Sequence, residues 1–363
     1  MERGRVLQAA EAYLQQRPET IVSVRSPRSP GGPHDFYSEG DYWWPDPKNP
    51  KGPYIRRDGE SNPDNFVAHR QLLMRLSIQM PALTAAWVLT KRRMFAEHAM
   101  AHLRAWFVTA ATRINPNLEY AQAIHGIDNG RSIGIIDTLH LVEVAQAARV
   151  LMQGKVLAGA DLEGTLRWFG EYLNWLTTSA HGREERAAKN NHGSCWLLQA
   201  AAFAQFTADA AVRRDGRERL KTVLLPEQIA PDGSFPMELA RTKPYSYSLF
   251  NLDVLAMCAL ILSDRSEDYW TLRLPDGVTM QTCFRFMVPY IEDKKRWPYR
   301  HDVEYFDDLP VRQPSLLFAG LVYREQRYLD LWKRLDPDPT LPEVIRNHPV
   351  RQPVLWMDES LQV

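Results

Sequence analysis

The stretch AKNNHGSCW, residues 188–196, places two amides and an imidazole side by side, just before the apolar run LLQAAAFAQF. Asparagine is a preferred N-cap residue, so the start of a helix explains part of this stretch. A cap needs one residue, however, and Asn190, Asn191 and His192 together exceed that need. The stretch is therefore either a helix start with a chance histidine or part of an active site.

A second polar group lies in ELARTKPYSYSLFNLDVL, residues 238–255. Arg241 and Tyr247 stand in a proline-interrupted approach to a helix. A structural role is also open, with Tyr247 at the edge of the core and Arg241 paired with Glu238. Tyr245 precedes Tyr247 by two residues, and in an extended segment both side chains would face the same side. Tyr245 could therefore compete for any role of Tyr247.

Together these side chains suit β-elimination from a chain of uronic acids. An enzyme must neutralise the carboxylate, remove the weakly acidic C5 proton and protonate the departing O4. Asn191 and a neutral His192 can hydrogen-bond the carboxylate. The pKa of a free phenol is about 10, and a neighbouring Arg241 would lower it, so that Tyr247 could act as the base. The same tyrosine could then protonate O4 if H5 and O4 share one face of the sugar, without a metal.

Most of the 363 residues have the periodicity of helices. Apolar residues recur at spacings of three and four in eight segments: 64–80, 82–108, 133–153, 161–178, 192–211, 248–263, 276–291 and 314–335. Strand-like alternation is nearly absent. The length would allow one large domain or two ordinary ones. Modest loops between successive helices favour an all-α fold of stacked helical hairpins, which we predict to form a single domain over residues 1–363.

Residues 25–63 form a long irregular segment that is rich in proline, glycine and aromatic residues. Disordered segments are poor in aromatics, so we predict that this one is ordered and lies across a groove. Tyr42, Trp43 and Trp44 could stack on sugar rings, although at least one tryptophan is expected to pack in the core. Residues 226–247 are predicted to form a turn and then an extended approach to the next helix.

The formal net charge is zero, so no global field attracts nucleic acid or an anionic membrane. No uninterrupted apolar stretch approaches the roughly 20 residues of a membrane span. A polyanion would have to meet a local patch, and Gln122, His125 and Arg131 in a polar loop could contact carboxylates. The dense basic run could form such a patch or a solvated face; it comprises Lys294, Lys295, Arg296, Arg300 and His301.

The remaining features of the sequence say less about function. Cys195, Cys258 and Cys283 lie far apart in apolar surroundings and are predicted to be buried thiols. The start, MERGRVLQAAEAYLQQ, predicts an amphipathic helix rather than a secretion signal. We expect a periplasmic or secreted protein if a signal has been removed, and a cytoplasmic one otherwise. Nothing in the sequence indicates the oligomeric state.

NNHGSCW together with ELARTKPYSYSLFNL resembles the alginate-lyase-type superfamily of polysaccharide lyases. GDYWWPDP, RDGESNPDNF and YAQAIHGIDNGRSIGIIDTLHL are also similar to its characteristic segments, and the resemblance covers roughly residues 30–335. The chain is most similar to polysaccharide lyase family 38, whose characterised activity is on β-1,4-glucuronan. The resemblance implies an (α/α) toroid, an incomplete barrel of helical hairpins around a substrate groove.

The resemblance also implies a lyase that uses no metal or other cofactor and binds an anionic polysaccharide. Asn191 and His192 would neutralise the carboxylate and Tyr247 would be both base and acid. Arg241 would adjust the pKa of Tyr247. Beside what the resemblance implies, we predict that Asn190 contacts the substrate and that Tyr245 is a platform for a sugar ring. Gly193 and Ser194 before Cys195 and Trp196 depart from the segment usual in family 5 alginate lyases. This favours glucuronan as the substrate, with polymannuronate second.

Two other classes of function stay open at this point. A uronyl glycoside hydrolase on the same scaffold would need two carboxylates flanking the bond, and the candidates are Asp35, Asp41, Asp128 and Asp137. A non-catalytic polysaccharide-binding protein would not require a base. The presence of Asn191, His192, Arg241 and Tyr247 together argues against that class.

Overall fold

The computed structural model describes residues 2–357 and is mainly helical. Its helices are α1 (Glu2–Tyr13), α2 (Ala68–Thr90), α3 (Arg93–Leu103), α4 (Leu141–Gln153), α5 (Gly159–Thr178), α6 (Ala180–Ala187), α7 (Asn191–Phe206), α8 (Ala210–Arg219), α9 (Leu225–Gln228), α10 (Pro236–Leu239), α11 (Pro244–Leu262), α12 (Met280–Glu292), α13 (Pro314–Val322), α14 (Gln326–Arg334) and α15 (Pro342–Arg346). The predicted all-α class is confirmed.

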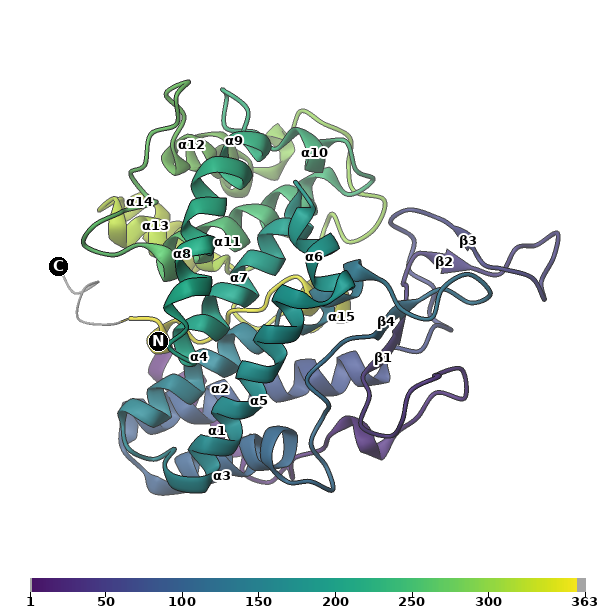
Figure 1. Cartoon of the computed structure of the whole chain (residues 1–363). Helices are drawn as coiled ribbons and strands as arrows, with labels where there is room; N and C mark the ends of the chain where they lie inside the picture. The colour runs from purple at the N-terminus through teal and green to yellow at the C-terminus, as the bar shows by residue number, and fades with distance from the viewer. Residues whose placement is uncertain (1, 358–363) are drawn as a thin grey trace.

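Helices that follow one another in the chain pack as hairpins, as in the pairs α2–α3, α7–α8 and α13–α14. Helix α7 lies at the centre and also contacts α4, α5, α6 and α11 (Figure 1). These helices form an incomplete (α/α) toroid, and the predicted helix at the start of the chain is α1. All three cysteines are free and buried, as predicted.

Helices α2 and α11 are long and apolar enough, by length and composition, to cross a membrane. However, 67% and 89% of their most apolar windows are buried inside the molecule. This burial identifies both as core helices, whose apolar side chains pack inside the molecule. Their burial fixes the position of the residues at their ends, including the start of α11 beside the cavity described below.

Four short strands lie to one side of the helices (Figure 1). Strand β1 (Tyr37–Glu39) pairs in parallel with β4 (Tyr120–Ala123), and β2 (Trp43–Trp44) pairs antiparallel with β3 (Ile55–Arg56). Three of the four come from segment 25–63. The pairing with β4 ties this long segment to the region between α3 and α4.

The approach to α11 differs from the extended segment that the sequence suggested. Helix α11 begins at Pro244, because proline at the first helical position costs no hydrogen bond and has a suitable φ. Tyr245 and Tyr247 therefore lie on a helix. Two residues correspond to about 200° of rotation at 3.6 residues per turn, so their side chains point in opposite directions.

The C-terminal segment returns to the middle of the molecule after α14 (Figure 1). The buried carboxylate of Glu143 on α4 accepts hydrogen bonds from the backbone of Arg351 and Gln352 and from the indole of Trp356. These contacts fix the chain that follows α15. Helix α15 consequently lies against the cavity formed by α7, α11 and segment 25–63.

Candidate active site

A cavity of about 400 Å³ opens where the starts of α7 and α11 meet segment 25–63 and α15. It brings together residues from six separate parts of the chain. Its lining is Asp41, Tyr42, Trp43, Arg56, Gln122, Arg131, Ile133, Ile136, Leu139, Asn190, Asn191, His192, Arg241, Tyr247, Phe250, Glu343, Arg346 and Asn347.

Asn190, Asn191 and His192, the three polar residues before the apolar run, have different structural roles. Asn190 is the N-cap of α7, and its side-chain oxygen accepts a hydrogen bond from the backbone N–H of His192 at 3.2 Å. Asn191 and His192 form the first turn of the helix, and all three residues line the cavity. The cap therefore explains Asn190, while the side chains of Asn191 and His192 remain available for chemistry.

His192 is held from behind by a buried carboxylate. Its Nδ1 lies 2.6 Å from Oε1 of Glu185 on α6, and the side chain of Glu185 is only 2% exposed. A carboxylate oxygen accepts hydrogen bonds, so this contact favours the tautomer of His192 with its proton on Nδ1. The Nε2 atom of the ring is then the nitrogen left for a ligand in the cavity.

Asn191 is held in the same way by Glu238 on α10. The two oxygens of Glu238 accept hydrogen bonds from the backbone N–H of Asn191 at 2.9 Å and from its Nδ2 at 2.7 Å. Burial raises the pKa of Glu238, and the two hydrogen bonds from Asn191 oppose this shift. The suggested pairing of Arg241 with Glu238 is not the one observed.

Tyr247 lies opposite, in the first turn of α11, with its hydroxyl at the centre of a polar cluster. Nη2 of Arg241 donates to Oη of Tyr247 at 3.1 Å, and its Cζ lies 4.4 Å from the centre of the phenol ring. The hydroxyl of Tyr42, from segment 25–63, lies 3.0 Å from Oη of Tyr247. Arg241 therefore donates to the oxygen that would act as the base, and Tyr42 can donate to the same oxygen once it is ionised.

The pKa of Tyr247 differs in direction from the sequence-based expectation. Burial raises it above the usual value, and the charge of Arg241 and the hydrogen bond from Tyr42 lower it only in part. One reason is that Nη2 of Arg241 also donates to Asp58 at 3.1 Å. That carboxylate offsets the guanidinium charge, so the lowering effect of Arg241 is smaller than the sequence suggested.

Asp58 is a site residue that the sequence did not single out. It also accepts hydrogen bonds from Thr242 Oγ1 at 2.9 Å and from Arg56 at 2.5 Å. Burial raises its pKa, but the hydrogen bond and charge of Arg241 outweigh this and hold the pKa at about 2. Asp58 lies within RDGESNPDNF, so the resemblance of that segment was the available signal.

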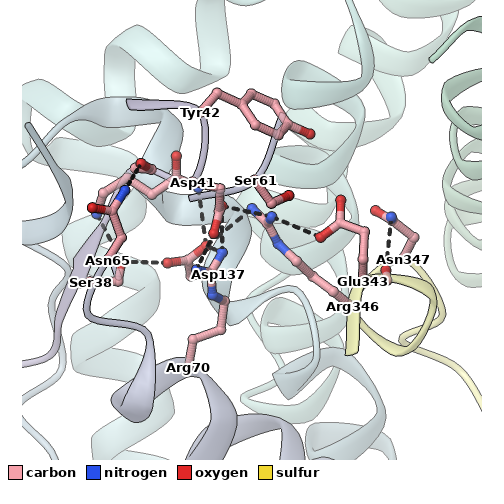
Figure 2. A network of polar contacts seen from close by, with 12 residues as sticks. Ser38, Asp41, Tyr42, Ser61, Asn65, Arg70, Asp137, Glu343, Arg346 and Asn347 are labelled. Carbon is pink, nitrogen blue, oxygen red and sulfur yellow. Dashed lines mark hydrogen bonds and ion pairs between the residues drawn. The ribbon is translucent and has the colours of Figure 1, made fainter. Parts of the chain in front are cut away.

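A buried network of ion pairs joins the C-terminal helix to the cavity wall (Figure 2). Arg346 on α15 pairs with Asp41 at 2.7 Å, and Arg70 on α2 pairs with the other oxygen of Asp41 at 2.6 Å. Asp137 lies 3.5 Å from Arg70 and 3.8 Å from Arg346. Burial raises the pKa of Asp41, but the charges of Arg346 and Arg70 hold it well below its usual range.

This network bears on the hydrolase alternative. Asp41 stays ionised between two arginines and is unsuited to the role of a general acid. The other three candidates, Asp35, Asp128 and Asp137, are absent from the cavity lining. Glu343 lines the cavity but lies 3.4 Å from Arg346. The described residues of the cavity thus lack the acid and base pair that hydrolysis would need.

Several other predicted residues lie at the cavity. Gln122 and Arg131 line it, and Nε of Arg131 donates to the carbonyl of Gln122 at 2.7 Å. Gln122 has a φ of 50°, a left-handed backbone that is uncommon for a residue other than glycine. Trp43 also lines the cavity, with Arg131 5.7 Å from its ring centre.

Tyr245, in contrast, is fully buried and cannot contact a sugar. Its hydroxyl donates to the carbonyl of Tyr290 at 3.0 Å, and its ring packs against Trp297 and Phe306. The prediction of a sugar platform at Tyr245 is wrong, because the helical backbone turns this side chain into the core. Tyr247 faces the cavity for the same reason.

The basic run is also not the positive patch of this cavity. None of Lys294, Lys295, Arg296, Arg300 and His301 is in its lining. Lys294 donates to the carbonyls of Phe306 and Leu309, and the ring of His301 stacks on Phe306. Arg300 donates to the carbonyl of Arg241 and so supports the backbone beside the site.

Four arginines scattered along the chain supply the positive charge of the cavity: Arg56, Arg131, Arg241 and Arg346. Sequence clustering could not reveal them. His125, predicted to contact a carboxylate, and Trp44, predicted to stack on a sugar, also lie outside the lining. His125 is exposed and packs against Tyr54, while the indole of Trp44 donates to the carbonyl of Glu60.

Comparisons with known proteins agree with the helical fold. Residues 20–297 match the model of the alginate lyase family. The chain is 29% identical to an alginate lyase from Bacteroides ovatus, whose crystal structure at 1.60 Å superposes with a TM-score of 0.84. That alignment covers 98% of this chain and 93% of the other. No curated protein gives a significant sequence match.

Two structures of alginate lyase A1-III, each complexed with a tetrasaccharide, superpose with TM-scores of 0.56. They are 14% and 16% identical to this chain and cover 97% of it and 94% of their own length. In one a histidine is replaced by alanine, and in the other a tyrosine by phenylalanine. At this identity the likeness shows the shared fold.

Proposed function

The chain belongs to the alginate lyase family and is a polysaccharide lyase, and from this premise we propose that it cleaves a β-1,4-linked polyuronate by syn β-elimination. One observation carries the proposal. The hydroxyl of Tyr247, hydrogen-bonded to Arg241 and Tyr42, shares a cavity with Asn191 and His192. A base and a carboxylate-binding wall therefore face the same space.

In the proposed reaction the uronate carboxylate at the cleavage site lies against Asn191 and His192. Their hydrogen bonds take up the negative charge that spreads from C5 onto the carboxylate as the proton leaves. Groups that are already oriented toward developing charge stabilise it without reorganisation. The buried partners Glu185 and Glu238 supply that orientation.

Tyr247 then carries the proton from one side of the bond to the other. As a phenolate it takes H5, and as a phenol it gives a proton to O4 while the C4–O4 bond breaks. Arg241 and Tyr42 stabilise the phenolate by hydrogen bonds to Oη. One group can serve both steps only if H5 and O4 lie on the same face of the ring.

Two polymers satisfy that stereochemical condition. Glucuronate and mannuronate differ at C2 but share the C4 and C5 arrangement. The sequence NNHGSCW favours β-1,4-glucuronan, and we propose it as the preferred substrate. The family and the structural neighbours carry the name of alginate lyases, which supports polymannuronate as the second candidate.

The test is incubation of the purified protein with glucuronan, polymannuronate and polyguluronate in separate reactions. We expect ultraviolet absorbance from 4,5-unsaturated uronate ends, fastest with glucuronan and next with polymannuronate. New reducing ends without this absorbance would mean hydrolysis and would overturn the proposal. Faster cleavage of polymannuronate would retain the mechanism and reverse the substrate preference.

A further inference from the structure

The two groups that would meet the substrate carboxylate rest on two different buried carboxylates. Glu238 holds Asn191 through two hydrogen bonds. The amide of Asn191 does not titrate and is neutral at every pH of interest. Glu185 holds His192, which can gain a proton. The two supports are alike in geometry, but only one of them acts on a group that titrates.

The contact with Glu185 decides which nitrogen of His192 faces the substrate. Because Glu185 Oε1 accepts the Nδ1 proton at 2.6 Å, a neutral His192 presents the lone pair of Nε2 to the cavity. A lone pair and a carboxylate oxygen repel each other, since neither can donate a hydrogen bond. The neutral ring can therefore not neutralise a uronate carboxylate in this orientation.

We infer that Glu185 is a positioning residue that makes His192 bind the substrate carboxylate as an imidazolium, so that substrate binding takes up a proton. The imidazolium donates from Nδ1 to Glu185 and from Nε2 to the uronate, and it lies between two negative charges. The proton comes from the solvent. This inference rests on the proposed function, because it takes the uronate carboxylate as the ligand of Nε2.

The charged groups around His192 come from several elements. Glu185 on α6 and Glu238 on α10 favour the imidazolium, whereas Arg241, before α11, opposes it. Arg131 also lines the cavity and opposes the imidazolium. Tyr247 carries no charge as a phenol and favours the imidazolium only as a phenolate. Glu185 is the group in direct contact with the ring, so its removal should have the largest effect on proton uptake.

The test measures binding of a glucuronate tetramer, or a mannuronate tetramer, to the Tyr247→Phe variant, which lacks the base and therefore does not cleave the ligand. This variant is the background protein for the further substitutions. Calorimetry at pH 8 in buffers of different ionisation enthalpy gives the number of protons taken up. At this pH an ordinary imidazole is neutral, so we expect uptake approaching one proton. Adding Glu185→Gln should reduce the uptake and weaken binding by about tenfold or more, because a charge-assisted hydrogen bond is lost.

Glu238→Gln in the same background is the matched control. It disturbs the support of Asn191 and should weaken binding, but because Glu238 does not contact the ring of His192 it should lower the proton uptake less than Glu185→Gln does. His192→Gln should abolish the uptake and covers the case in which Glu185→Gln does not fold. Equal uptake with and without Glu185, or no uptake at pH 8 in the background protein, would overturn the inference.

A second readout does not depend on substrate. Nitrogen-15 spectra of the free protein should show the Nδ1–H tautomer of neutral His192, and the Glu185→Ala variant should show the mixture of both tautomers. An Nε2–H tautomer in the parent protein would contradict the inference. Failure of the proposed function is recognised separately, as a wild-type protein that forms no unsaturated ends on any of the three polymers.

Discussion

The two walls of the cavity are built in different ways. On one wall, Asn191 and His192 belong to the first turn of a central helix, and their supports Glu185 and Glu238 lie 7 and 47 residues away in the chain. On the other wall, Tyr247 meets Tyr42 across 205 residues. Arg241, beside Tyr247, meets Asp58 across 183 residues.

This difference separates two physical tasks. On the wall proposed to bind the carboxylate, each group is held from behind by a buried carboxylate, Glu185 or Glu238. The wall that carries the proton depends on a long segment folding over the start of α11. Variants of Tyr247 and its neighbours should therefore affect the proton transfer. Variants of Asn191, His192 and their supports should affect the binding of the substrate carboxylate.

The largest effect is expected for Tyr247→Phe. Without the hydroxyl neither H5 removal nor O4 protonation has its catalyst, and kcat should fall by at least about 10³-fold. The fold should be unchanged, because the ring is retained. The measurement is the rate of unsaturated product formation, with circular dichroism and thermal unfolding as checks of the fold.

Tyr245→Phe is the matched control for that variant. It removes a hydroxyl two residues away that donates to the carbonyl of Tyr290 inside the core. The free energy of unfolding should fall by about 1 kcal/mol, while kcat stays near the wild-type value. Loss of activity in Tyr245→Phe and its retention in Tyr247→Phe would exchange the roles of the two residues.

A smaller but still large effect is expected for Arg241→Gln, with kcat lower by about 100-fold. Only the phenolate of Tyr247 can take the proton, so activity rises with pH through the pKa of Tyr247. Burial raises this pKa, and Arg241 lowers it. Removing Arg241 therefore raises the pKa further, and the acidic limb of the kcat profile should move to higher pH.

Arg56→Gln is the control for the pH profile, since Arg56 also bonds Asp58 but is not bonded to Tyr247. This variant should alter KM more than the position of the acidic limb. A profile for Arg241→Gln that matches the wild type in position would mean that another group is the base.

Tyr42→Phe tests the contact made by segment 25–63. It keeps the ring and removes the hydroxyl 3.0 Å from Oη of Tyr247. Loss of one hydrogen bond to the phenolate should lower kcat by about tenfold. Trp44→Phe, in the same segment but outside the cavity lining, should have little effect on kcat. Similar losses in both variants would indicate a general disturbance of the segment.

Sequence reasoning found the elements whose signals are local. Apolar periodicity indicated the helices, and the excess of polar groups at Asn190, Asn191 and His192 marked the start of α7 as unusual. It failed for Tyr245, because a proline in this segment suggests a break before the helix, whereas Pro244 is the first residue of α11. The same local error led to the expectation that Tyr245 and Tyr247 share a face.

The remaining site residues could not be predicted, because tertiary contacts alone bring them to the cavity. Glu185 stands in the charged run REER, where nothing marks it as the one that is buried. Glu343 and Arg346 lie beyond the resemblance, in a short helix whose place depends on Glu143 and on the ion pairs of Asp41. The cavity's arginines come from four distant segments, whereas the sequence drew attention to the contiguous run at 294–301.

The smallest effect is expected at the cap of α7, where the question is whether Asn190 serves only the helix. Asn190→Ala removes the acceptor of the His192 N–H and should cost about 1 kcal/mol in the free energy of unfolding. It should also lower kcat/KM less than tenfold, as the first turn loosens around Asn191 and His192. Asn190→Ser retains a capping oxygen and should restore both quantities. If Asn190→Ser regains stability but not kcat/KM, the amide itself contacts the sugar, and the carboxylate-binding wall includes Asn190 as well as the two residues that follow it.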